Sequence, residues 1–144
     1  MAYPALDIAR HTLTYCTSKS HPISNLKLQK ILYFLWIDYY KETRMALYED
    51  DICAWQLGPV VPDVYYEYCS YAGKPIVAQD YPRIEVIDTS ILNRLIDKYI
   101  LISASTLVNR THQPNKPWSV VYQDGIGIRD VIPFSLITRL ECNC

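Results

Sequence analysis

Residues 25–42 read NLKLQKILYFLWIDYYKE, and this stretch decides the fold. Its apolar side chains recur at spacings of three and four residues, which indicates an amphipathic helix, and Ser24 just before it suits an N-cap. The apolar stripe is wide, because it includes Leu28, Ile31, Leu32, Leu35, Trp36, Ile37 and Tyr39. A helix this apolar is predicted to lie at the centre of a domain, with neighbours on more than one side.

Helices are also predicted on both sides of this stretch. The first covers residues 5–18 and ends before His21-Pro22, because the residue before a proline is pushed out of the helical conformation. Pro62 suits the first turn of another helix and Gly73 suits its end. Further helices are expected from Asp88 or Thr89, over 103–110, briefly over 119–122, and from Pro133.

A short β element interrupts the helices. In residues 52–57, ICAWQL, the apolar pattern changes from helical to alternating, which predicts a strand that Gly58-Pro59 breaks. Residues 84–86, IEV, could form a second strand that pairs with the first. The segment 111–118 is rich in Pro and Asn and is expected to be irregular. The sequence therefore predicts one compact domain over residues 1–144, mainly α, with about six helices and a minor β element.

Composition limits the classes of function. The chain has 144 residues, 50% of them hydrophobic, which suits one globular domain with a core. Its net charge is -1, so no overall attraction to nucleic acid is expected. No apolar run reaches the roughly 20 residues that cross a bilayer. The five cysteines show no disulfide or zinc pattern and no secretion signal opens the chain, so a cytoplasmic protein with reduced thiols is expected.

The sequence shows no pattern typical of a catalytic or metal site. His11, His21 and His112 lack metal-ligand spacing, and the acidic run 49–51 is typical of a solvated charge cluster. Phosphate-binding glycine motifs and a nucleophile elbow are missing. We therefore expect no enzyme, no cofactor and no metal. The catalytic alternative is a hydrolase that uses His112, which requires an Asp or Glu within hydrogen-bond reach.

Two segments stand out from this background. Residues 54–62, AWQLGPVVP, place a tryptophan beside a rigid Gly-Pro corner, which suits either a recognition surface or a corner with Trp55 plugged into the core. Residues 111–118, THQPNKPW, suit either a binding rim or a loop folded onto the core, with His112 bonded to backbone carbonyls. Both readings stay open for both segments.

Together with residues 26–34, LKLQKILYF, these segments resemble a known family. The three motifs have the order and spacing of the Panacea domain, also described as a SocA-like or phage-associated domain. The resemblance implies no catalytic residue. It marks a set of motif positions with a structural role, namely Leu28, Lys30, Gly58, Pro59, Val60, Pro62, Thr111, Pro117 and Trp118.

The resemblance implies an antitoxin that neutralises a toxin by direct protein binding, with a protease-adaptor role in one branch of the family. The alternative is a phage or mobile-element effector that binds and inhibits a host defence or regulatory protein. The expected partner is a protein, neither a membrane nor a nucleic acid. The chain has 13 Tyr against 2 Phe, and Tyr suits half-buried binding surfaces. The predicted partner-binding residues are Trp55, Tyr65, Tyr66, Tyr68, Tyr39, Tyr40 and His112.

Overall fold

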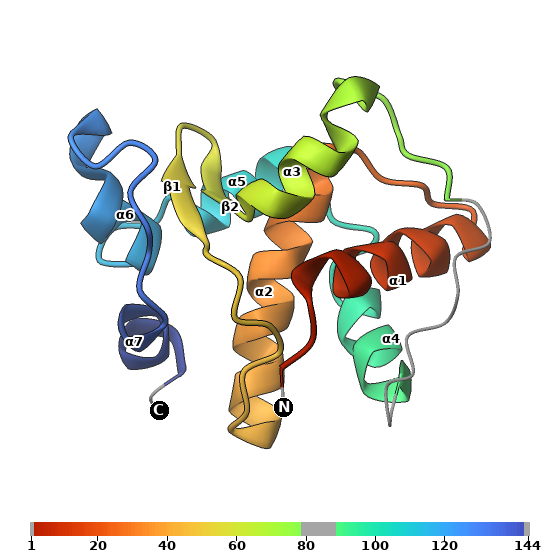
Figure 1. Cartoon of the computed structure of the whole chain (residues 1–144), viewed down its shortest axis with the longest axis horizontal. Helices are drawn as coiled ribbons and strands as arrows, with labels where there is room; N and C mark the ends of the chain where they lie inside the picture. Colours follow the sequence, from red (N-terminus) through yellow and green to blue (C-terminus); the bar gives the residue numbers. More distant parts are fainter. Residues whose placement is uncertain (1, 79–88, 143–144) are drawn as a thin grey trace.

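Helix α2 (Asn25–Thr43) is the axis of the fold, as the apolar stripe predicts. The computed structural model describes residues 2–78 and 89–142, and in it α2 runs through the middle of the molecule with the other elements around it (Figure 1). The Ser24 side chain caps the helix by accepting a hydrogen bond from the Lys27 backbone N–H at 3.2 Å. The helix ends at Arg44, which has a left-handed φ of 60°.

The remaining elements lie around α2. The described residues contain seven α-helices and one two-stranded sheet, so the expectation of a mainly α chain with a minor β element is confirmed. The other elements are α1 (Ala5–Ser18), β1 (Cys53–Trp55), β2 (Gly58–Val60), α3 (Pro62–Tyr68), η1 (Cys69–Tyr71), α4 (Thr89–Asp97), α5 (Ala104–Thr111), α6 (Pro117–Tyr122), η2 (Gln123–Gly125), α7 (Phe134–Ile137) and η3 (Thr138–Cys142).

The core forms where these elements meet α2. Its apolar residues come from nearly every element, and the largest fully buried aromatic side chains are Trp36, Tyr33 and Tyr48. Two of these satisfy their polar atoms on backbone carbonyls: Trp36 Nε1 donates to Tyr48 O at 2.9 Å, and Tyr48 Oη donates to Leu32 O at 2.8 Å. The buried tyrosine hydroxyl and the buried indole N–H therefore each have a hydrogen-bond partner, which offsets the loss of their contacts with water.

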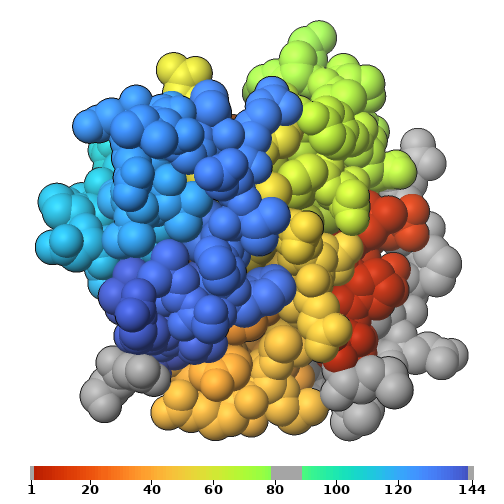
Figure 2. All heavy atoms as spheres, turned by 60° about the vertical axis from the view of Figure 1, so that its left-hand side comes forward, coloured from red at the N-terminus to blue at the C-terminus, as the bar shows by residue number. Residues whose placement is uncertain are grey.

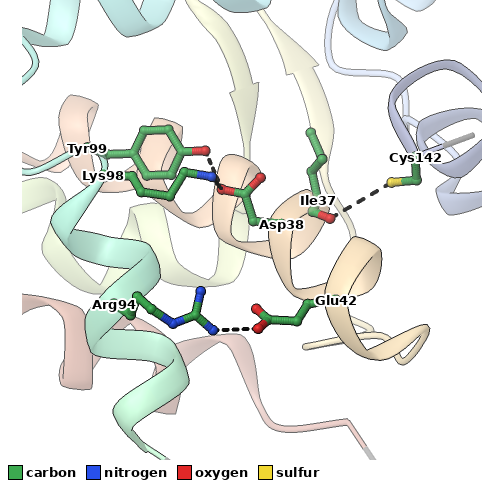
Figure 3. A network of polar contacts seen from close by, with 7 residues as sticks. All are labelled: Ile37, Asp38, Glu42, Arg94, Lys98, Tyr99 and Cys142. Carbon is green, nitrogen blue, oxygen red and sulfur yellow. Dashed lines mark hydrogen bonds and ion pairs between the residues drawn. The ribbon is translucent and has the colours of Figure 1, made fainter. Parts of the chain in front are cut away.

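Polar contacts fix α4 and the C-terminal segment on opposite sides of α2 (Figure 3). Asp38 accepts hydrogen bonds from Lys98, at 2.9 Å, and from the hydroxyl of Tyr99. One turn further along α2, Glu42 pairs with Arg94 at 2.5 Å. On the other side, the Cys142 thiol donates to Ile37 O at 3.9 Å. These contacts set the position of α4 and of η3 along the central helix.

The β element is a tight hairpin, and this corrects the predicted bounds of the first strand. Strands β1 and β2 pair antiparallel with Trp55 opposite Gly58, so residues 56–57 form the turn. The predicted strand 52–57 therefore ends at Trp55, and Gly58-Pro59 begins a strand instead of breaking one. Gly58 permits this because its φ of 114° lies in the region that favours glycine. The predicted strand 84–86 lies outside the described residues.

A second segment lies along the free edge of β1. Ala54 N donates to Asp130 O at 2.8 Å, Arg129 N donates to Ala54 O at 2.6 Å, and Ile132 N donates to Ile52 O at 2.7 Å. The segment 129–132 therefore pairs with β1 from the side opposite β2. Nothing in the sequence indicated this pairing, which brings residues near the C-terminus next to the hairpin.

The segment 111–118 is more regular than predicted. Helix α5 includes Thr111, and α6 already begins at Pro117, two residues before the expected start. Proline at the first helical position costs no intrahelical hydrogen bond, which explains why α6 starts there. Ser103 caps α5, and its side chain accepts a hydrogen bond from Thr106 N at 3.2 Å. Within residues 2–78 and 89–142, no helix is both long and apolar enough to cross a membrane.

Candidate partner-binding site

The three sequence motifs meet at one junction, formed by α2, β2 and the end of α5. Lys30 of α2 is 0% exposed, and its ammonium donates a hydrogen bond to Pro59 O at 2.9 Å. A Cβ at Gly58 would lie 2.7 Å from Thr111 Oγ1 and 2.9 Å from Lys30 Cε. Only glycine fits between these two side chains. The contact of the three motifs therefore explains the glycine at position 58.

Gln29 and Asn25 form a second set of contacts at this junction. The Gln29 side chain accepts from Val61 N at 2.9 Å and donates to Asn25 Oδ1 at 3.0 Å. Asn25 in turn donates to Tyr65 O at 3.1 Å. Both amide side chains are buried, and each is bonded to the chain that follows the hairpin. They fix the path from β2 into α3.

A stack of rings connects α6 to the hairpin. The rings of His112 and Trp118 are parallel with centroids 3.8 Å apart, and Trp118 stacks on Tyr122 at 4.5 Å. Trp118 Nε1 donates to Trp55 O at 2.8 Å. Trp118 is therefore a buried structural residue that holds the backbone of β1 in place.

His112 lacks the partners that a catalytic base needs. Its Nε2 is buried without a hydrogen-bond partner, and in the described part of the chain neither ring nitrogen bonds to a carboxylate. Burial lowers the pKa of His112, the charge of Lys30 lowers it further, and a hydrogen bond with the Leu57 backbone acts in the opposite direction. The described geometry therefore offers no carboxylate–histidine pair for a hydrolase.

Lys30 is the most strongly perturbed cation of the junction. Burial lowers its pKa to about 7. Within residues 2–78 and 89–142 it has no carboxylate within ion-pair distance, so the low dielectric of the core penalises its charged form without compensation. The pKa of Lys30 is therefore held well below that of a solvent-exposed lysine.

Three aromatic side chains meet on the surface beside this junction, and we call Trp55, Tyr65 and Tyr66 the aromatic corner. The Trp55 ring meets Tyr65 edge-on at 4.9 Å and lies 6.0 Å from Tyr66, and the two tyrosines meet at 5.6 Å. Tyr66 is 57% exposed, and the neighbouring Leu57 at the hairpin turn is 53% exposed. The guanidinium of Arg129 lies over the Trp55 ring at 4.5 Å.

A pocket of about 380 Å³ opens next to the aromatic corner. It is lined by the start of α2, by the hairpin, by Tyr65 and by the segment 128–129. Figure 2 looks onto this side of the molecule, where the C-terminal part, in blue, approaches α3, in green, with the hairpin region, in yellow, between them. The pocket combines aromatic and aliphatic walls with a few polar groups, which is the composition of a recognition site.

Comparison with known proteins places the chain in a family. A family model described as "Antitoxin SocA-like, Panacea domain" matches residues 28–119. The chain belongs to this family. It is also 31% identical to Antitoxin SocA of Caulobacter vibrioides, over 75% of this chain and 67% of that protein. No solved structure matches the chain.

The resemblance suggested by the three motifs is therefore confirmed, and the Panacea motif positions have a structural explanation. Leu28 and Val60 are buried in the core or at its edge, and Pro62 occupies the first turn of α3. Thr111 is buried and donates to Val108 O at 2.7 Å. Pro117 is buried at the first turn of α6. All five residues lie within the matched range.

The predicted partner-binding residues fall into separate places in this Panacea fold. Trp55, Tyr65 and Tyr66 come together as the aromatic corner. Tyr68 does not join them, because it is 3% exposed and packs in the core. Tyr39 and Tyr40 lie half-buried near the other end of α2, where Tyr40 stacks on Trp36 at 5.4 Å. His112 belongs to neither group, and its ring stacks on Trp118.

The sequence did not indicate that residues 128 and 129 line the pocket at the aromatic corner. Ile128 is 49% exposed and lines the pocket together with Arg129, although both follow the range that the family model matches. Their position depends on the backbone pairing with Ala54, which joins residues 75 positions apart. The sequence of residues 124–127, DGIG, is typical of a loop, but it does not show where that loop lies in the fold.

Proposed function

We propose that this chain is an antitoxin that neutralises a protein toxin by binding it directly, without chemistry of its own, through the aromatic corner. Membership of the antitoxin SocA-like family supports the antitoxin role. The observation that carries the proposed surface is the ring cluster of Trp55, Tyr65 and Tyr66 beside an exposed Leu57. Exposed aromatic side chains on a rigid frame are typical of binding hot spots.

The hairpin makes this surface rigid before a partner arrives. Trp55 is held by the Trp118 bond to its carbonyl, and Tyr65 is held by the Asn25 bond to its carbonyl. A surface that is already ordered loses little conformational entropy on binding. The aromatic corner therefore suits a partner that is recognised by shape, with most of the free energy from a few buried rings.

The test uses the product of a gene adjacent to that of this chain, if it is toxic when expressed alone. We expect co-expression of this chain to restore growth and the purified proteins to form a complex. Tyr66→Ala and Leu57→Ser should each weaken that complex at least about tenfold, since one buried aromatic or leucine side chain contributes on that scale. Met45→Ser is the matched control, because Met45 is 47% exposed and follows the C-terminal end of α2, whereas the pocket lies at the start of that helix.

Neutralisation by purified protein separates direct binding from delivery to a protease. If stoichiometric amounts of this chain inhibit the toxin's activity in a purified mixture, direct binding is sufficient. If the toxin is inhibited only in cells that contain an active protease, the chain is a protease adaptor and the proposed blocking mechanism is wrong. A chain that captures a host defence protein and no toxin would instead support the effector alternative.

A further inference from the structure

The pocket beside the aromatic corner is positively charged, although the chain is not. Lys30 and Arg129 are among its lining residues, and no Asp or Glu is. The whole chain has 15 acidic and 14 basic residues, so this separation of charge is local. A pocket of about 680 Å³ near the C-terminus contrasts with it, because Asp130 and Arg139 both line that pocket. Of these two pockets in the described part of the chain, the one at the corner has charged lining residues of one sign.

Helix α2 adds to the positive potential, because it begins at this pocket. Asn25 and Leu26, its first two residues, are lining residues. The first N–H groups of a helix have no partner inside the helix, and the aligned peptide dipoles give that end a partial positive charge. This α-helix has 19 residues, so its dipole is fully developed. The helix end, Lys30 and Arg129 therefore act in the same direction.

Lys30 and Arg129 affect the pocket in different ways. Lys30 is fully buried and uses one donor on Pro59 O, so its charge acts on the pocket through the low dielectric of the core. Arg129 is exposed, and in the described part of the chain its side chain has no ion pair. The guanidinium lies over the Trp55 ring, and its N–H groups, which have no ion pair, can bind a carboxylate through two parallel hydrogen bonds.

We propose that this pocket binds a carboxylate of the toxin, with Arg129 as the contacting group and with the adjacent apolar side chain of the toxin against Trp55, Leu57 and Ile128. The inference rests on the proposed function, since it names the chemical group that the antitoxin would recognise. A carboxylate next to an apolar residue matches both the charge of the pocket and its aromatic and aliphatic walls. The carboxylate can belong to a Glu or Asp side chain or to a chain terminus.

Short peptides test the pocket without the toxin. The probes are N-acetyl-Leu-Glu-amide, which offers a side-chain carboxylate, and N-acetyl-Leu-Leu with a free C-terminus, which offers a terminal one. N-acetyl-Leu-Gln-amide is the neutral control of nearly identical shape. Binding is followed by amide and indole shifts in ¹⁵N-labelled protein. We expect at least one acidic probe to bind about tenfold tighter than the neutral one, as for a charge-assisted bidentate pair.

Substitution of Arg129 assigns the effect to the pocket. Arg129→Gln should abolish the preference for the acidic probe, whereas Arg139→Gln, in the other pocket, should preserve it. The proposal would be overturned if the unaltered protein bound neither acidic probe more tightly than the neutral peptide. It would also be overturned if inorganic phosphate bound as tightly as the acidic peptide, because the pocket would then be a general anion site that fits nucleic-acid phosphates as well.

The complex with the toxin separates this inference from the proposed function. If the unaltered chain neutralises the toxin and Arg129→Gln does so equally well, the carboxylate inference is wrong and the antitoxin role stands. If the unaltered chain neutralises no toxin while the acidic peptide still binds through Arg129, the pocket is correct and the proposed function is wrong. A loss of toxin binding by Arg129→Gln, with Arg139→Gln unaffected, supports both.

Discussion

Lys30 and Pro59 are joined by a hydrogen bond of 2.9 Å between a buried ammonium and a backbone carbonyl 29 residues away along the chain. This bond fixes the hairpin to the central helix at the point where the three family motifs meet. When Lys30 is protonated, the core also holds a positive charge with no carboxylate beside it among the described residues. The stability of the fold should therefore depend on whether Lys30 carries its proton.

Stability is predicted to rise with pH because of Lys30. Burial lowers the pKa of Lys30 to about 7 in the folded chain, whereas an unfolded lysine titrates near ~10.4. Between these values the unfolded chain binds more protons, so the free energy of unfolding rises with pH. We expect the free energy of unfolding of the unaltered protein, relative to that of Lys30→Met, to rise by about 3 kcal/mol from pH ~7 to pH ~9.5, measured by urea unfolding.

The comparison with Lys30→Met removes the effect of other groups that titrate in this range, such as Cys16, whose pKa is raised to about 11 by burial. Lys41→Met is the matched control, because Lys41 is an exposed lysine on the same helix. It should follow the pH dependence of the unaltered protein. A parallel pH dependence for Lys30→Met would contradict the burial of an uncompensated charge at this position.

Gly58→Ala is expected to destabilise the fold by about 2 kcal/mol or more, because it combines a clash with an unfavourable backbone angle. The new Cβ would lie 2.7 Å from Thr111 Oγ1, at a φ of 114°. Gly73→Ala is the control, since a Cβ there meets no atom within 4 Å. Thermal unfolding of both variants makes the comparison, and equal stability would rule out the tight contact at the junction.

Gln29→Met tests the second set of contacts. The substitution keeps the length of the side chain but leaves Val61 N–H and the Asn25 side chain without their partner. We expect a loss of about 2 kcal/mol, the typical cost of an unsatisfied buried donor. Gln113→Met, on an exposed glutamine, should change stability by less than about 0.5 kcal/mol. Similar values for the two variants would show that Val61 finds another acceptor.

The polar contacts that α2 makes with α4 and with the two residues after it should differ in strength. Glu42 and Arg94 have side chains that are 40% and 57% exposed, and such pairs contribute at most about 0.5 kcal/mol. Asp38 is only 13% exposed and accepts from both Lys98 and Tyr99. Double-mutant cycles should therefore give a coupling of about 1 kcal/mol or more for Asp38 with Tyr99, and a smaller one for Glu42 with Arg94. Equal couplings would contradict this order.

The helices could be predicted from sequence because their signals are local. The apolar stripe of residues 25–42, the Ser24 and Ser103 caps and the Pro62 helix start each act within a few residues. The strand pairing was not predictable in the same way. The pattern in residues 52–57 did not show that the hairpin turn falls at 56–57, because this register depends on Gly58 packing against Lys30 and Thr111.

The candidate site could be predicted only in part, for the same reason. Composition suggested tyrosines at the surface, and Trp55, Tyr65 and Tyr66 do meet there. Burial cannot be read from residue type, so the sequence did not separate the exposed Tyr66 from the buried Tyr68. Arg129 was missed because it reaches Trp55 through the pairing of its backbone with Ala54, a contact between distant parts of the chain.

The central position of α2 also bears on how long the protein lasts in a cell. This helix contacts α1, α3, α4, α5, β2 and η3, so few elements can detach while the others stay folded. Partial opening, which in many proteins gives proteases a first cleavage site, should then be rare, and degradation should follow the small fraction of molecules that unfold completely. Every change in overall stability would translate directly into cellular abundance, even one made far from the aromatic corner.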